Sequence, residues 1–193
     1  MVISLDKGAN LSLTKEEPGL TIARIGLGWD ARTTNGAEFD LDASALLVGR
    51  DGKVRSDADF IFYGQKADAA GAVVHQGDNR TGEGDGDDEQ ILVDLALVPE
   101  DVDKVVFVVS IYKADENGQN FGQVRNSYIR LLDDANQKEV AKYELGEEVA
   151  SENAVIFAEV YRYSGEWKFR AVGQGFLDGL GGIARDFGVH ISN

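Results

Sequence analysis

The run KVVFVVSIY, residues 104–112, is the most apolar stretch of the 193-residue chain. Its valine, isoleucine and aromatic side chains favour strands, and the run lacks the polar alternation of a strand with one wet face. An uninterrupted apolar strand is typical of a sheet that is covered on both sides. Residues 104–112 are therefore expected to form a central strand buried on both faces.

Turn signals before and after this run divide the chain into short strands. Turn residues between alternating segments indicate hairpins. They predict three of them: residues 2–5 with 10–13, residues 128–132 with 139–145, and residues 154–163 with 166–172 around Ser164-Gly165. The last is the clearest hairpin in the sequence.

The remaining patterns complete a mainly β fold. Residues 21–29 alternate, which predicts a strand with Ala23, Ile25, Leu27 and Trp29 on its core face. Apolar residues over 176–187 recur at helical spacing. Roughly ten short strands without regular helix–strand alternation predict a β-sandwich. The expected architecture is two antiparallel sheets with a short C-terminal helix, folded as one domain over residues 1–193.

Composition narrows the classes of function. The formal net charge is −15, which disfavours binding to nucleic acid and to anionic membranes. The chain has no cysteine, so it offers neither a disulfide framework nor a thiolate nucleophile. It shows no signal peptide and no apolar run of the ~18–20 residues that would span a bilayer. We expect a cytoplasmic protein, with its two histidines, His75 and His190, on the surface.

An acidic, glycine-rich stretch lies between two apolar segments: Gly77-Asp78-Asn79-Arg80-Thr81-Gly82-Glu83-Gly84-Asp85-Gly86-Asp87-Asp88-Glu89. Carboxylates this close repel one another unless water or a cation separates them. Glycines allow a loop to turn its carbonyls inward around an ion. All candidate ligands are oxygens, which favours calcium first and magnesium second. The alternative is a solvated acidic loop.

Two known calcium motifs do not fit this stretch. Asp78 to Glu89 has the twelve-residue length of an EF-hand loop, but Glu83 stands where that loop needs glycine. The glycine–aspartate pattern also resembles one repeat of a calcium-binding β-helix, an architecture that needs several stacked copies.

A second group of acids begins an otherwise apolar segment, residues 39–48. Alternation places Asp40 and Asp42 on one face of the expected strand and Leu41 on the other. The pair is either a solvent-facing edge or a second source of ligands beside the acidic stretch.

The acidic stretch resembles the signature of the TerD family of tellurium-resistance and stress proteins. Supporting segments extend the resemblance over the full length: GLGWD at 26–30, FDLDAS at 39–44, DFIFY at 59–63, FGQV at 121–124 and GEWKFRAVGQG at 165–175. The resemblance implies a β-sandwich that binds two calcium ions. It also implies association with other Ter proteins, the integral membrane protein TerC and the cytosolic protein TerB.

The oxygen ligands can be divided between two ions of six to eight ligands each. The first ion is expected to take the side chains of Asp78, Asn79, Asp85, Asp87, Asp88 and Glu89, with backbone carbonyls of Arg80 or Thr81. The second is expected to take Asp40, Asp42 and Asp30, with a bridging carboxylate such as that of Asp88. Alanine at Asp85 or Asp87 should then lower calcium affinity and barely change the melting temperature in chelator.

These patterns favour a non-enzymatic calcium-binding stress protein. It would act as a calcium-dependent adaptor, recruited through a partner to the inner face of the membrane. The alternative is calcium-dependent binding of a small ligand, a cyclic nucleotide or phosphate; calcium-bridged docking on lipid headgroups ranks last. No Gly-x-Ser-x-Gly motif supports a hydrolase, and chemical reduction of tellurite would need thiols, which the chain lacks.

Overall fold

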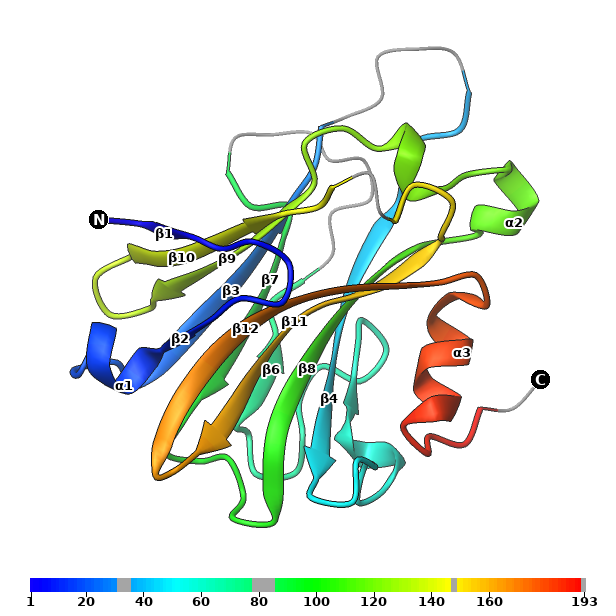
Figure 1. Ribbon diagram of the computed structural model, residues 1–193. Coiled ribbons are helices and arrows are strands. Elements are labelled where there is room, and N and C mark those ends of the chain that lie inside the picture. Colours follow the sequence, from blue (N-terminus) through cyan, green and yellow to red (C-terminus); the bar gives the residue numbers. More distant parts are fainter. Residues whose placement is uncertain (31–35, 78–85, 147–148, 192–193) are drawn as a thin grey trace.

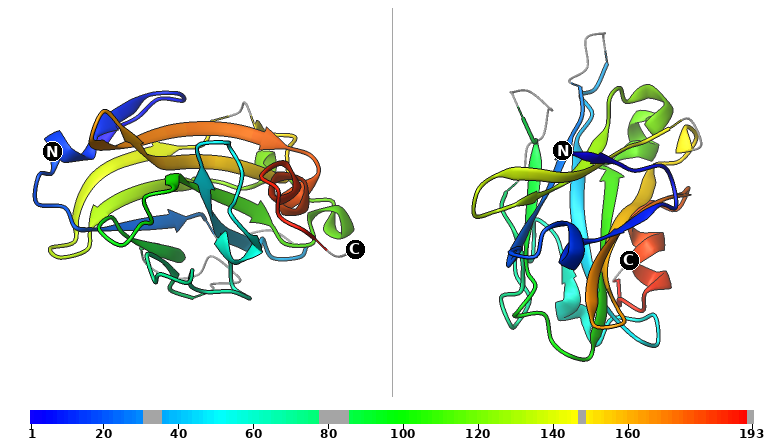
Figure 2. Two further views of the ribbon diagram at one scale, coloured as in Figure 1. Left: turned by 90° about the horizontal axis from the view of Figure 1, so that it is seen from below. Right: turned by 60° about the vertical axis from the view of Figure 1, so that its left-hand side comes forward.

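The protein is described from a computed structural model that covers residues 1–30, 36–77, 86–146 and 149–191. Two six-stranded sheets lie face to face as a β-sandwich (Figures 1 and 2). Sheet A has the order β1 (Ile3–Ser4), β10 (Lys138–Glu144), β9 (Tyr128–Asp133), β3 (Ile22–Gly28), β7 (Glu89–Asp94) and β6 (Val73–His75). Sheet B has the order β2 (Asn10–Ser12), β12 (Glu166–Phe176), β11 (Ala154–Tyr163), β8 (Val102–Ile111), β4 (Leu41–Gly49) and β5 (Phe60–Ile61).

Strand β8 confirms the prediction of a central strand buried on both faces. It lies between β11 and β4 in sheet B. Val105, Phe107 and Val109 face the core between the sheets. Val106 and Val108 face a second apolar cluster on the outer side of the sheet. The short helix α3 (Gly179–Asp186) packs into that cluster, so the predicted C-terminal helix is present and is shorter than its apolar pattern.

Two predicted hairpins are confirmed and the opening one is wrong. Strands β9 and β10 pair antiparallel, as do β11 and β12, whose turn residues Ser164 and Gly165 both have positive φ. Strands β1 and β2 do not pair with each other. Strand β1 joins sheet A, parallel to β10, and β2 joins sheet B, antiparallel to β12. Local alternation marked both segments as strands, but their partners are distant in sequence.

Short helices and the expected core face of β3 complete the described fold. Ala23, Ile25, Leu27 and Trp29 are all buried, as predicted. The remaining short helices are α1 (Leu13–Glu16), α2 (Ala114–Asn117), η1 (Asp57–Asp59) and η2 (Phe121–Gln123). In the part of the chain that the structure covers, no helix is long and apolar enough to cross a membrane.

Candidate metal centre

The end of the acidic stretch is attached to the end of β3. Strand β7 pairs antiparallel with β3, with Glu89 opposite Leu27. One residue earlier, the backbone N–H of Asp88 donates to the carbonyl of Leu27 at 2.8 Å. The Trp29 N–H in turn donates to Oδ2 of Asp88 at 3.0 Å. The Asp88 carboxylate therefore takes up a backbone donor just beyond the last residue of β3.

Asp88 lies in a crowded acidic environment. Burial raises the pKa of its carboxyl, and the charges of Asp87 and Asp30 raise it further. The hydrogen bond from the Trp29 N–H opposes this shift and does not outweigh it. The ionised carboxylate of Asp88 is thus destabilised by its surroundings, and a nearby cation would relieve the repulsion.

Asp87 points in a different direction, onto the outer face of sheet A. Its Oδ1 accepts hydrogen bonds from the Tyr128 hydroxyl at 2.9 Å and from Arg130 Nε at 2.8 Å. Its side chain is 1% exposed. The carboxylate lies over Gly26, where any β-carbon would collide with it. Gly28 has the same role for the Tyr128 ring.

The Asp87 carboxylate also affects its phenolic neighbour. Burial raises the pKa of Tyr128, and the charge of Asp87 and its hydrogen bond raise it further. The hydroxyl therefore remains a donor to Asp87 at neutral pH. Asp87 is held by protein donors rather than directed toward an open site.

Glu89 points inward, between the edges of the two sheets. Its Oε2 accepts the backbone N–H of Ala43, near the start of β4. His75, on β6, places Nε2 3.7 Å from the same oxygen. His75 Nδ1 accepts the Gly77 N–H at 3.1 Å, so in the neutral ring the proton is on Nε2 and faces Glu89. Both side chains are almost fully buried, which corrects the prediction that His75 lies on the surface; His190 is exposed as predicted.

The remaining predicted acids lie near the ends of β3 and β4. Asp42 is 6% exposed, opposite Ser110 on β8, so it is not a solvent-facing edge residue. The carbonyl of Asp40 accepts the Tyr112 N–H at 2.7 Å. Asp30 Oδ2 accepts from Asn126 Nδ2 at 2.6 Å.

The structure describes only part of the predicted ligand set. Asp78, Asn79, Arg80, Thr81 and Asp85 lie outside the described residues. Within the described ranges, no group of three or more acids or histidines is arranged to hold a metal. The donors that are described near the ends of β3 and β4 are carboxylates, a set that fits a hard cation such as calcium.

Sequence analysis missed the partners that hold this end of the acidic stretch. Tyr128 and Arg130 are two residues apart on β9 and therefore share a face, a pattern visible in the sequence. Their contact with Asp87 depends on β9 pairing with β3, which no local pattern indicates. The Ala43 group that donates to Glu89 is a backbone N–H, so the residue type at this position does not indicate the contact.

The amino-acid sequence is similar to those of tellurium-resistance and stress proteins. A family model described as TerD domain matches residues 1–187. The chain is 53% identical over 192 residues to tellurium resistance protein TerD of Serratia marcescens, covering 100% of both chains. It is 46% identical to general stress protein 16U of Bacillus subtilis, covering 99% of this chain and 100% of that protein.

Solved structures support the fold. A crystal structure of a protein of unknown function matches with a TM-score of 0.73 at 22% identity, covering 90% of this chain and 99% of the other. A homologue of telluride resistance protein (TerD) from Streptomyces coelicolor matches with a TM-score of 0.70 at 24% identity, covering 86% and 96%. At these identities the likeness concerns the β-sandwich alone.

Proposed function

Because the chain belongs to the TerD family, we propose that it is a non-enzymatic calcium-binding protein of bacterial tellurite resistance and general stress response. One observation carries the proposal. The end of the acidic stretch is tied to the two strands at whose ends the other predicted acids lie, through Asp88 to the end of β3 and through Glu89 to the start of β4. The end of the acidic stretch thus lies close to Asp30 and reaches the start of β4, which Asp40 and Asp42 flank in the sequence.

The described acidic residues would have two roles at such a site, as calcium ligands and as anchors of the acidic stretch. Asp88, Asp30, Asp40 and Asp42 are the described carboxylates that would hold calcium. Asp87 and Glu89 anchor the stretch, because their carboxylates bind donors of sheet A and of β4. Bound calcium would supply the positive charge that offsets the repulsion among these acids. Binding would thereby order the surface near the ends of β3 and β4.

The proposed role of that surface is to bind a partner. Other Ter proteins, TerB and the membrane protein TerC, are the proposed partners, with this protein in the cytoplasm and recruited to the inner face of the membrane. This role requires neither a catalytic step nor nucleic acid. A pull-down of TerB and of TerC that succeeds in calcium and fails in chelator tests the adaptor role separately from calcium binding.

Thermal unfolding in chelator, magnesium and calcium tests the proposed metal site. A ligand at 100 times its dissociation constant stabilises the native state by about 2.7 kcal/mol. For a chain of this length that corresponds to a rise in melting temperature of about 5–11 °C. We expect the rise in calcium and a smaller one in magnesium, with two equivalents of calcium by calorimetry. An unchanged melting temperature in all three conditions would contradict the site.

The substitution Asp88→Asn tests whether Asp88 binds calcium or only stabilises the fold. The amide oxygen can still accept the Trp29 N–H, and the substitution removes a charge that Asp87 and Asp30 repel. We expect the free energy of unfolding in chelator to change by less than about 0.5 kcal/mol, whereas calcium affinity falls at least tenfold. Calorimetric titration measures the affinity. Unchanged affinity would remove Asp88 from the ligand set.

A further inference from the structure

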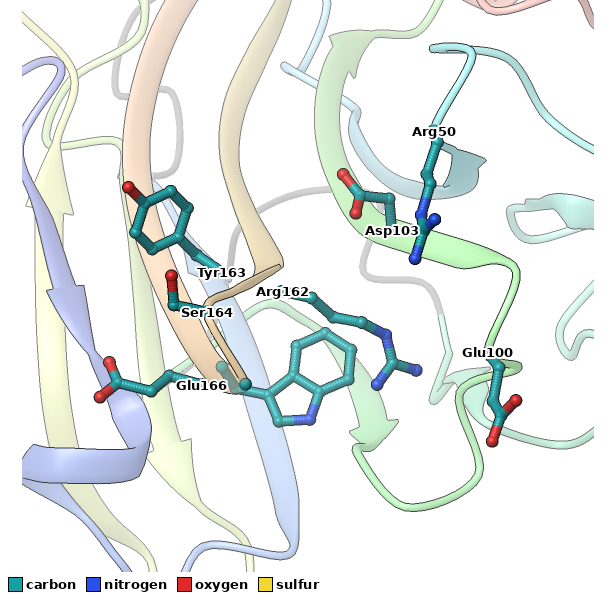
Figure 3. A pocket seen from close by; sticks show the side chains of 9 residues that line it. Arg50, Glu100, Asp103, Arg162, Tyr163, Ser164 and Glu166 are labelled. Carbon is teal, nitrogen blue, oxygen red and sulfur yellow. The ribbon is translucent and has the colours of Figure 1, made fainter.

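A pocket of about 340 Å³ with several charged residues in its lining lies at the tip of the β11–β12 hairpin (Figure 3). It is lined by Arg50, Glu100, Asp103, Arg162, Tyr163, Ser164, Gly165, Glu166 and Trp167. Arg50 follows the end of β4, whereas Ala43, which binds Glu89, lies near its start. The two are seven positions apart along an extended chain, roughly 20 Å. The pocket is therefore remote from the candidate metal centre.

Arg162 is fixed in this pocket by its own surroundings. Its Nε donates to the carbonyl of Val102 at 3.1 Å, and its Nη2 donates to those of Val98 at 2.9 Å and Pro99 at 3.3 Å. The guanidinium also stacks on Trp167, its cross-strand neighbour, with its carbon 4.3 Å from the ring centroid. These contacts hold the side chain in place before any ligand binds, and all three acceptors are backbone carbonyls rather than carboxylates.

Arg50 brings a second positive charge to the same space. Figure 3 shows both guanidinium groups directed into the pocket, Arg50 from the loop after β4 and Arg162 from β11. Within the described residues neither of them forms an ion pair, although the chain has 34 acidic and 19 basic residues. Nε and Nη2 of Arg162 are engaged by the three carbonyls, so this side chain offers a ligand its Nη1 amino group. The guanidinium of Arg50 adds a fork, and the two cations together suit a compact anion such as a phosphate group.

The acidic residues of the pocket define the rest of the ligand. Three carboxylates line it. Glu166 is held by Ser12 Oγ at 3.0 Å and by Lys15 at 3.3 Å, whereas Glu100 and Asp103 pair with neither arginine within the described residues. Carboxylates accept hydrogen bonds and repel a bare polyanion. The cavity also has room beyond a single phosphate group. A fitting ligand combines one phosphate with hydroxyl or amino donors.

We propose that this pocket binds a phosphate monoester of a small hydroxyl- or amino-bearing compound, independently of calcium. Arg162 and Arg50 bind the phosphate group, and Glu100 and Asp103 accept hydrogen bonds from the remainder. This site is a second one, apart from the proposed metal centre, and it does not depend on that proposal.

The two tryptophans of the chain report on the two sites separately. Trp167 lines the pocket, and Trp29 donates its backbone N–H to Asp88. In a nuclear magnetic resonance titration in chelator, glycerol 3-phosphate is expected to shift the indole N–H signal of Trp167 to saturation. The signal of Trp29 is expected to stay unchanged. Inorganic phosphate should bind more weakly than glycerol 3-phosphate, and glycerol alone should cause no shift.

Arg50→Gln and Arg185→Gln form a matched pair of exposed substitutions with the same change in net charge. Arg50→Gln is expected to weaken glycerol 3-phosphate binding about tenfold, whereas Arg185→Gln, on α3, should leave it unchanged. If both substitutions weakened glycerol 3-phosphate binding equally, the cause would be the change in net charge and not the loss of a pocket residue. That result would overturn the proposal. A Trp167 signal that does not saturate by about 20 mM ligand, or tighter binding of inorganic phosphate, would overturn it as well.

Discussion

Asp87→Ala is expected to lower the free energy of unfolding in chelator by about 4 kcal/mol. The substitution removes the carboxylate that joins the Tyr128 hydroxyl to the Arg130 guanidinium, which then retains Glu139 at 3.2 Å as its carboxylate partner among the described residues. It also opens a void over Gly26, because the Asp87 carboxylate fills the space that a side chain at this position would occupy. For a chain of this length the melting temperature should fall by about 8–16 °C. Differential scanning calorimetry in chelator measures the change.

A double-mutant cycle identifies the cause of this loss. If the pair with Arg130 dominates, Arg130→Ala should cost a similar amount, and the double variant should cost clearly less than the sum. Asp186→Ala, an exposed acid on α3, is the control and should cost less than about 0.5 kcal/mol. A nearly unchanged melting temperature of Asp87→Ala in chelator would restore the expectation from the sequence, in which Asp87 serves only as a calcium ligand.

His75→Ala is expected to have the second largest effect, about 3 kcal/mol in chelator. The imidazole is almost fully buried at the sheet edges, so its removal leaves a cavity. The Gly77 N–H loses its acceptor, and Glu89 loses the Nε2–H that faces it. Chemical denaturation in chelator gives the free energy of unfolding.

Calcium titration of the same variant tests whether His75 also positions the acidic stretch. His75 precedes that stretch and Glu89 ends it, so their contact holds the two ends together. We expect calcium affinity to fall at least tenfold in protein that is still folded. An effect on stability with unchanged affinity would assign His75 to packing alone. His190→Ala is the control, because its side chain is 92% exposed and should contribute little to either quantity.

The sequence predicted most of the fold because most of its signals are local. The β8 segment shows its burial in its own composition, and the β11–β12 hairpin shows its turn in Ser164-Gly165. Family membership likewise follows from motifs spread along the chain, and the family match confirms it. The prediction of an opening hairpin was wrong because alternation identifies a strand but does not identify the strand with which it pairs. Strands β1 and β2 pair with β10 and β12, more than 100 residues away.

For the candidate site, too, the sequence indicated the chemistry and only the structure showed the positions of the side chains. The sequence by itself determined that a run of carboxylates stands between two strands and that its chemistry favours a hard cation. Only the tertiary structure decided that Asp87 lies on the outer face of sheet A, Asp88 at the end of β3 and Glu89 between the sheets. Adjacent residues of an extended chain point in different directions. Which partners they meet depends on strands that are neighbours in space and distant in sequence.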